Sequence, residues 1–115
     1  MDADENNNRN NAWRFTIYIA GNTGRSASII ARLKEICDLY VGDDYDIQIV
    51  DLLEHPELSR QHQILAVPTV VRTYPFPERR VIGDLSYTVL VVSGLELPLK
   101  ALKRHQKEQS LPANP

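Results

Sequence analysis

The loop that connects the first apolar stretch to the first amphipathic stretch carries the residues most suited to chemistry. It lies within YIAGNTGRSAS, residues 18–28, where a glycine-containing turn precedes a helical pattern. Backbone N–H groups at the start of a helix can bind phosphate, and two cysteines placed there could exchange disulfides. The loop is too short for a phosphate-binding P-loop, lacks its lysine and contains no thiol. It could equally shape a surface for another protein, while Arg25 leaves a weak anion site as a further interpretation.

The other reactive side chains do not form a recognisable catalytic or metal site. Cys37 is the only cysteine, and it falls on an apolar helical stripe, where a thiol behaves as a small buried hydrophobe. His55 and His62 could share a helix face, but no cysteine or third imidazole stands at ligand spacing. Asp51 ends a strand without an acid–base partner, and no serine stands in a nucleophile elbow. We therefore predict no enzyme activity, no metal and no cofactor.

Length and composition indicate one small domain. The 115 residues are 43% hydrophobic and 24% charged, with a net charge of -2, which gives no general attraction for nucleic acid. No apolar run is long enough to cross a membrane, the N-terminal stretch is not a signal peptide, and one cysteine fits a reducing compartment. We expect a cytoplasmic protein that binds neither nucleic acid nor membranes. Its predicted parts are a disordered tail at 1–12, a domain at 13–103 and a flexible tail at 104–115.

Hydrophobic patterns in the first half predict a strand, a helix and a second strand. Residues 13–19, WRFTIYI, alternate between apolar and polar side chains, as in a strand with one buried face. Residues 26–41 repeat apolar side chains at helical spacing, with Thr23 or Ser26 as the N-cap. Residues 45–53 form the second strand, so this half predicts a right-handed parallel unit.

The second half has a less regular pattern. A short helix is predicted at 56–63, followed by a hairpin whose strands are 67–74 and 79–83. In the last element, residues 84–104, helix and strand signals compete. Asp84 or Ser86 could cap a helix, but several residues that follow are strand formers. These strand formers are Tyr87, Thr88, Val89, Val91 and Val92.

The predicted order of strand, helix, strand, helix, hairpin and helix is the thioredoxin-like arrangement, an α/β fold. The segment AVPTV supports it, because thioredoxin-like folds carry a proline, often cis, where the strand after the second helix begins. A cis Val67–Pro68 bond would make that turn rigid and place Pro68 beside residues 20–26. The paired cysteines of a redox enzyme would stand in this loop, which contains none.

Five blocks of the sequence resemble the KaiB family of circadian clock proteins. They extend from about Trp13 to Leu97, in the family's order and spacing. The blocks are YIAGNTGRS, VDLLEHPEL, ILAVPTV, YPFPERRVIGDLS and SGLEL. The resemblance implies a non-enzymatic adaptor that binds the ATPase KaiC, then sequesters KaiA and competes with a sensor kinase whose thioredoxin-like domain is related.

The resemblance also implies two folds. Family members can rest as a tetramer with one arrangement of the second half and bind as a thioredoxin-like monomer with another. We therefore expect a homo-oligomer, dimer or tetramer, in the resting state, and the competing signals in 84–104 agree with two close packings. The candidate partner-binding or fold-switch residues are Trp13, Gln48, Gln63, Pro68, Arg79, Arg80, Gly83, Asp84, Gly94 and Glu96.

The chain departs from the family pattern at positions that the resemblance links to docking. Family members typically have proline where Gly24 stands and lysines where Gln48 and Gln63 stand. These departures from the resemblance imply a divergent family member that serves a different KaiC-like ATPase. Two other functions stay open as alternatives. One is an input domain that acts with a sensor kinase in stress signalling, and the other is a thiol oxidoreductase, which the lone Cys37 argues against.

Two substitutions test the predicted switch. In a thioredoxin-like state Gly94 would lie inside the final helix, where glycine costs about 0.5–1 kcal/mol relative to alanine. Gly94→Ala is therefore expected to favour that state. Glu96→Arg is expected to act in the same direction if Glu96 is paired in the resting fold. Gly83 is expected to permit a tight turn before the last helix.

Overall fold

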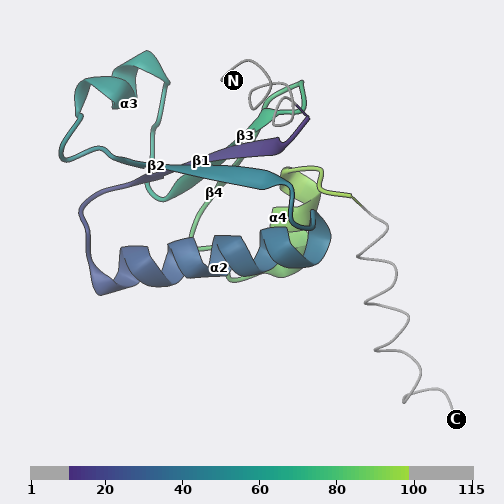
Figure 1. Ribbon diagram of the computed structural model, residues 1–115. Helices are drawn as coiled ribbons and strands as arrows, with labels where there is room; N and C mark the ends of the chain where they lie inside the picture. The colour runs from purple at the N-terminus through teal and green to yellow at the C-terminus, as the bar shows by residue number, and fades with distance from the viewer. Residues whose placement is uncertain (1–10, 99–115) are drawn as a thin grey trace, which may run out of the picture.

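The computed structural model describes residues 11–98, which form one sheet covered by helices on both faces (Figure 1). The longer helices lie against one face, and a short helix lies over the other. The elements are β1 (Trp13–Ile19), α2 (Gly24–Tyr40), β2 (Tyr45–Asp51), α3 (Glu57–Gln61), β3 (Thr69–Tyr74), β4 (Arg79–Ile82) and α4 (Thr88–Gly94). The predicted order of elements is confirmed. The predicted limits of the domain and its tails stay predictions, because residues 1–10 and 99–115 lie outside the described part.

The sheet has the strand order β2-β1-β3-β4. Strands β1 and β2 are parallel, with Trp13 opposite Tyr45 and Ile19 opposite Asp51, so the predicted parallel unit is confirmed. Strand β3 is antiparallel to both β1 and β4, which confirms the hairpin. Within residues 11–98, none of the helices combines the length and the apolar character needed to cross a bilayer.

The main core lies between the sheet and helices α2 and α4. Phe15 and Ile17 of β1 meet Leu33 of α2 there, and all three side chains are almost fully buried. From α4, Val92 enters the same cluster. Burial of each such side chain contributes about 1.5–3 kcal/mol relative to leaving it exposed, so this cluster fixes α2 and α4 on the sheet.

Strand β1 is buried on both faces, so the prediction of a single buried face is wrong. Thr16 and Tyr18 are 7% and 6% exposed, although they alternate with the core residues. Tyr18 packs with Ile64 and Val71 in a second cluster, to which Leu58 of α3 adds. Because β1 is a central strand and α3 covers its other face, both sets of side chains are removed from water.

The start of α2 is fixed by the side chain of Thr23, which confirms one of the two predicted caps. Its Oγ1 accepts a hydrogen bond from the Ser26 backbone N–H at 3.1 Å. The Ser26 hydroxyl donates to the carbonyl oxygen of Gly21 at 2.7 Å. Ser26 therefore lies inside the first turn of α2 and holds the preceding loop against it.

The start of α4 differs from the prediction. Neither Asp84 nor Ser86 caps this helix, because α4 begins at Thr88, and Tyr87 at the N-cap makes no side-chain capping bond. Asp84 Oδ1 instead accepts hydrogen bonds from the Ser86 N–H at 3.1 Å and the Ser86 hydroxyl at 2.6 Å. This closes a local turn after Gly83, whose φ of 122° confirms that a glycine is needed there. The predicted continuation of the helix beyond residue 98 lies outside the described residues.

Gly94 approaches β4 closely, which reverses the expected effect of Gly94→Ala. A Cβ atom at this position would lie 2.5 Å from Val81 Cγ2, and a β-branched side chain cannot easily turn away. Glu96 pairs with Arg79 at 2.5 Å within this same thioredoxin-like packing. Glu96→Arg would therefore remove a contact of this packing, whatever Glu96 does in a resting fold.

We predict that Gly94→Ala lowers the free energy of unfolding by about 1 kcal/mol. Overpacking against Val81 costs about 1–3 kcal/mol, and the better helix propensity of alanine returns only about 0.5–1 kcal/mol. Urea denaturation followed by circular dichroism measures the change. The double variant Gly94→Ala/Val81→Ala supplies the control, since it removes the clash and should be less sensitive to the alanine at 94. A single Gly94→Ala variant more stable than the unaltered chain would contradict the close approach.

We predict that Gly24→Pro raises the free energy of unfolding by about 0.4–1 kcal/mol, because proline restricts the unfolded chain. Gly24 is the first residue of α2, where the N–H has no intrahelical acceptor, and a Cβ there meets no atom within 4 Å. Thr23 is extended, at φ -118° and ψ 171°, as proline requires of the residue before it. Ala27→Pro is the control, since it loses the 3.0 Å bond to Thr23 O and should cost about 3 kcal/mol. Equal stability of the two variants would refute this account.

Candidate functional site

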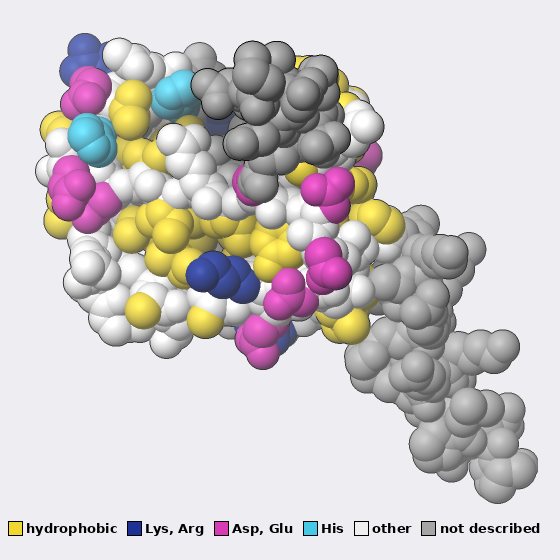
Figure 2. All heavy atoms as spheres, in the orientation of Figure 1, with side chains coloured by type: hydrophobic (Ala, Val, Ile, Leu, Met, Phe, Trp, Pro, Cys, Tyr) yellow, Lys and Arg dark blue, Asp and Glu magenta, His cyan; other side chains and the backbone are white. Residues whose placement is uncertain are grey.

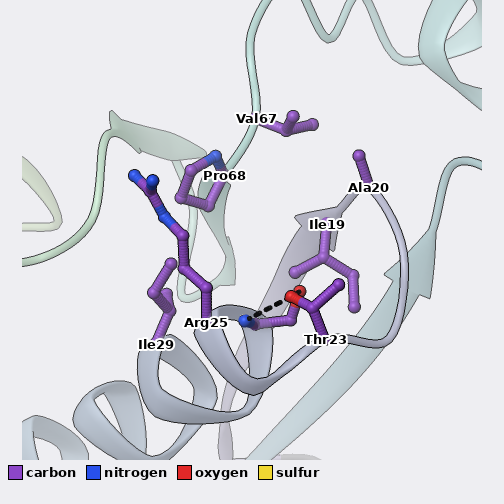
Figure 3. Close-up of a pocket in the computed structure, with 8 residues that line it drawn as sticks. Ile19, Ala20, Thr23, Arg25, Ile29, Val67 and Pro68 are labelled. Atoms are coloured by element: carbon purple, nitrogen blue, oxygen red, sulfur yellow. Dashed lines mark hydrogen bonds between the residues drawn. The ribbon is translucent and has the colours of Figure 1, made fainter.

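A pocket of about 250 Å³ opens where β1 ends and α2 begins (Figure 3). The segment that leads into β3 forms its opposite wall, and the Val67–Pro68 bond in that segment is cis. In Figure 3 the Arg25 side chain extends beside the ring of Pro68, so the predicted neighbourhood of Pro68 and the loop is confirmed. The lining residues are Ile19, Ala20, Thr23, Arg25, Ser26, Ile29, Val67 and Pro68.

Asp51 fixes the loop that forms the rim of this pocket. Its Oδ1 accepts hydrogen bonds from the Gly21 N–H at 2.8 Å and from the Leu53 N–H at 2.9 Å. Gly21 has a φ of 94°, and a Cβ there would lie 3.2 Å from Leu53 Cδ1. The carboxylate at the end of β2 therefore has a structural role, in holding the β1–α2 loop and the β2–α3 loop together.

Among the described residues that line the pocket there is no cysteine, histidine, lysine or carboxylate. Arg25 is the one charged side chain that residues 11–98 contribute to its lining, and the Ser26 hydroxyl donates to Gly21 O. The thiol of Cys37 lies in the main core and is fully buried. Burial, together with the nearby Asp38 carboxylate, raises the pKa of Cys37 to about 12, so this thiol stays protonated at neutral pH.

His55 and His62 do not form a metal centre with other described side chains. Within the described residues 11–98, no three side chains of histidine, cysteine, aspartate or glutamate are grouped as metal ligands. The His55 Nδ1 lies 3.9 Å from Glu57 Oε2, and the ring of His62 lies 6.1 Å from the ring of Tyr18. The two imidazoles therefore have separate surroundings.

Large apolar side chains are exposed in the pocket wall and in the chain segments next to it. Leu65, Leu53 and Val67 are 93%, 70% and 42% exposed, and all three belong to the segments that border the pocket or its loop. We call Arg25, Leu53, Leu65, Val67 and Pro68 the Pro68 surface. Hydrophobic side chains also show between α2 and β2 on the face seen in Figure 2. Grouped exposed apolar residues are typical of surfaces that bind other proteins.

Two of the predicted site residues act from β4. Arg80 donates to the carbonyl oxygens of Gln63 and His62 at 3.0 and 2.8 Å, so it attaches β4 to the end of α3. Arg79 pairs with Glu96 after α4, and this bond, the largest cause, lowers the pKa of the Glu96 carboxyl. The two arginines therefore bind elements on opposite faces of the sheet.

The remaining predicted residues are dispersed. Gln48 is exposed on the edge strand β2, and Trp13 is half-buried at the start of β1. Pro68 lies in the pocket, Gly83 and Asp84 form the turn before α4, and Gly94 ends α4. The ten predicted residues therefore do not converge on one site. Their roles as partner-binding or fold-switch residues stay predictions.

Sequence reasoning missed Arg72, a buried cation in β3. Its side chain is 4% exposed, its Nη2 donates to Pro77 O at 3.0 Å, and its guanidinium lies 5.4 Å from the Trp13 ring centre. Its Nε has no hydrogen-bond partner among the described residues, and burial lowers its pKa. Sequence reasoning also missed that Leu65 and Val67 are exposed. The apolar run before Pro68 was a signal for this, because it follows neither a helical nor a strand period.

Comparison with known sequences yields one family. The pattern described as KaiB domain matches residues 16–97. The chain is 38% identical over 87 residues to the circadian clock protein KaiB3 of Synechocystis sp., covering 76% of this chain and 85% of that protein. It is 40% identical over 81 residues to the circadian clock oscillator protein KaiB of Synechococcus elongatus, covering 70% and 79%.

Comparison with solved structures confirms the predicted thioredoxin-like fold. The N-terminal domain of Synechococcus elongatus SasA superposes with a TM-score of 0.62 at 15% identity, over 81% of this chain and 85% of that domain. Mitochondrial thioredoxin 3 of Saccharomyces cerevisiae superposes with a TM-score of 0.57 at 18% identity, over 82% and 87%. Identities this low show the fold alone.

We predict that iodoacetamide alkylates Cys37 in the folded chain about a thousandfold more slowly than in the urea-unfolded chain at pH 8. A pKa that rises by about three from its ordinary value lowers the thiolate fraction by that factor. Mass spectrometry of timed samples measures both rates, with the unfolded chain as the control. Rates within about tenfold of each other would show an accessible thiolate and reopen the question of redox chemistry.

Proposed function

The chain belongs to the KaiB family, and we propose that it is a non-enzymatic, clock-type adaptor that binds a KaiC-like ATPase and modulates its phosphorylation state or output signalling. The observation that carries this proposal is the Pro68 surface. Where a redox enzyme would place two cysteines, Thr23, Gly24 and Arg25 stand without a thiol. Exposed apolar side chains border that same place, which favours a docking role over a chemical one.

The chemistry of the Pro68 surface suggests what the ATPase presents to it. Arg25 is its only charged member, and Gln48 and Gln63 stand where the family resemblance would lead one to expect lysines. Leu65 and Val67 supply apolar area that a partner can remove from water. We propose that the docked surface of this ATPase is mainly apolar with one carboxylate for Arg25, rather than an acidic patch. This would distinguish the partner from an ATPase that recognises a basic adaptor.

The alternative candidate is an interaction domain that acts with a sensor kinase in stress signalling. The same fold and the same Pro68 surface would serve it, so geometry does not separate the two partners. Co-purification does, because a clock-type adaptor should retain a KaiC-like ATPase and an input domain should retain a sensor kinase. The clock proposal carries three further expectations. A KaiA-like protein joins once the ATPase is bound, the protein is cytoplasmic, and it forms a homo-oligomer in the resting state.

We predict that Leu65→Asp and Val67→Asp each weaken binding of a KaiC-like ATPase by at least about tenfold, which corresponds to about 1.4 kcal/mol. A carboxylate in an apolar contact must lose its hydration without gaining a partner. Biolayer interferometry against purified KaiC-like ATPases from the same organism measures the affinity.

Phe76→Asp is the matched control for these variants. Phe76 is 79% exposed, but it lies in the β3–β4 turn, at the end of the sheet where Arg14 pairs with Tyr74, away from Pro68. Its substitution should change the affinity by less than about twofold, well below the tenfold loss of a contact residue. Unchanged affinity of the Leu65 and Val67 variants would refute the Pro68 surface as the docking site. Retention of a sensor kinase alone would favour the alternative.

A further inference from the structure

An apolar groove of about 470 Å³ follows the second half of α2, and we call it the α2 groove. Its apolar lining comes from Ile36, Leu39 and Tyr40, and Thr88 closes it from the α4 side. Ile36 and Tyr40 are buried, whereas Leu39 is 51% exposed. An apolar side chain from another segment could therefore pack on Leu39 and leave the water.

Carboxylates border the α2 groove near the end of the helix. Glu35 and Asp38 line it, and the exposed Asp43 follows in the loop after α2. Asp38 is held in place, because its Oδ1 accepts a hydrogen bond from the Tyr45 hydroxyl at 2.6 Å. Figure 2 shows acidic side chains gathered over this end of α2. An occupant of the groove therefore meets negative charge beside an apolar wall.

The end of α2 itself also favours a positive charge. Its last turn contains no basic residue, and the backbone carbonyls give this end of a helix a partial negative charge, to which Asp38 adds. Arg32 is the one cation that residues 11–98 contribute to the lining, and its Nε and Nη2 already donate to Leu85 O and Thr88 Oγ1 at 3.2 and 2.6 Å. The occupant must therefore bring its own positive charge.

The described part of the chain finishes close to the end of α2. Leu97 enters the main core together with Tyr40, the last residue of α2. In Figure 1 the last described residues lie at the right, on the side where α2 ends. Lys100 and Lys103 follow Pro98 by two and five residues, so they can lie up to about 7 and about 17 Å from it. Both are therefore within reach of the α2 groove.

Residues 99–115 have the charge and the apolar side chains that the α2 groove requires. They contain four of the chain's 13 basic residues and one of its 15 acidic residues. Leu99 and Leu102 alternate with the first of these basic residues. The four basic residues are Lys100, Lys103, Arg104 and Lys107.

The N-terminal residues 1–10 do not match the groove. Their three carboxylates, Asp2, Asp4 and Glu5, outnumber Arg9. Like charges brought together repel, so the carboxylates that border the α2 groove would oppose this segment. Charge thus selects the C-terminal segment over the N-terminal one.

We propose that residues 99–104 of this chain bind in the α2 groove, with Leu102 on Leu39 and with Lys100 and Lys103 beside Asp38 and Glu35. A tethered segment reaches an effective concentration of the order of mM, so a contact that would be weak between separate molecules is sufficient. The contact is intramolecular and needs no ATPase, so it goes beyond the proposed adaptor function.

Carbodiimide cross-linking of the full chain tests the proposal, because this reagent joins an amine directly to a carboxylate that touches it. Three of the chain's four lysines lie in residues 99–115, so mass spectrometry can assign their cross-links. Lys100 and Lys103 should be joined to Asp38 and Glu35. Glu54 is the control, an exposed carboxylate that follows β2 at the opposite end of the sheet, and it should not be joined. Absence of the cross-links to Asp38 and Glu35 overturns the proposal.

A leucine variant separates binding in the groove from chance contacts of a tethered segment. Leu102→Asp keeps every lysine but places a carboxylate on Leu39, so it should lower the yield of these cross-links by at least about threefold. Leu111→Asp is the matched control, since it adds the same charge outside residues 99–104 and should leave the yield unchanged. Circular dichroism verifies that both variants keep their secondary structure. Equal yields from Leu102→Asp and the unaltered chain would overturn the proposal.

Isotope mixing shows which molecule supplies the segment. An equal mixture of heavy-isotope-labelled and unlabelled chain should give cross-links within one isotope only. Cross-links between the two isotopes would mean that another copy fills the groove, and they would overturn the proposal.

The cross-links are measured without any ATPase, so this proposal and the proposed function fail separately. If the cross-links form but no KaiC-like ATPase binds, the adaptor function is refuted and the groove contact stands. If the ATPase binds but the cross-links do not form, the groove contact is refuted and the adaptor function stands.

Discussion

The burial of β1 on both faces is the constraint on which the rest of the structure depends. Its odd-numbered side chains enter the core under α2 and α4, and Thr16 and Tyr18 enter the smaller cluster under α3. Its two edges are occupied by β2 and β3. A strand so enclosed has no freedom to shift register, because a shift of one residue would exchange its two sets of buried side chains. Every loop at its carboxyl end is therefore held in a defined position.

The candidate docking surface follows from that position. Since β1 and β2 are parallel, their carboxyl ends meet at one edge of the sheet, and Asp51 links the two loops that leave it. Pro68 enters from the antiparallel strand β3, whose start faces Tyr18 near the end of β1. The surface is thus assembled from three segments that are distant in sequence. The surface differs from a redox site in the identity of a few side chains, whereas the thioredoxin-like backbone arrangement is the same.

Sequence patterns predicted the elements and their order well, because periodicity and turn residues are local signals. They did not predict the second buried face of β1, since Thr16 and Tyr18 have the polarity of surface residues and only the position of α3 removes them from water. They did not predict how closely Gly94 approaches Val81, because helix propensity is local whereas that approach is tertiary. For the site, the loop and Pro68 were predicted together. Leu65 and Val67 were not, because exposure depends on what packs nearby.

The hydrogen bonds of Arg80 couple two parts of the chain energetically. One guanidinium in β4 binds the carbonyl oxygens of His62 and Gln63, which directly precede the segment that carries Leu65 and Val67. A molecule that binds this segment therefore also stabilises the packing of β4 in the sheet. Thermodynamic linkage is reciprocal, so a change that displaces β4 must lower the affinity for that molecule by the same factor. The stability of the β4 packing and the affinity for a molecule bound at Leu65 and Val67 are therefore thermodynamically coupled.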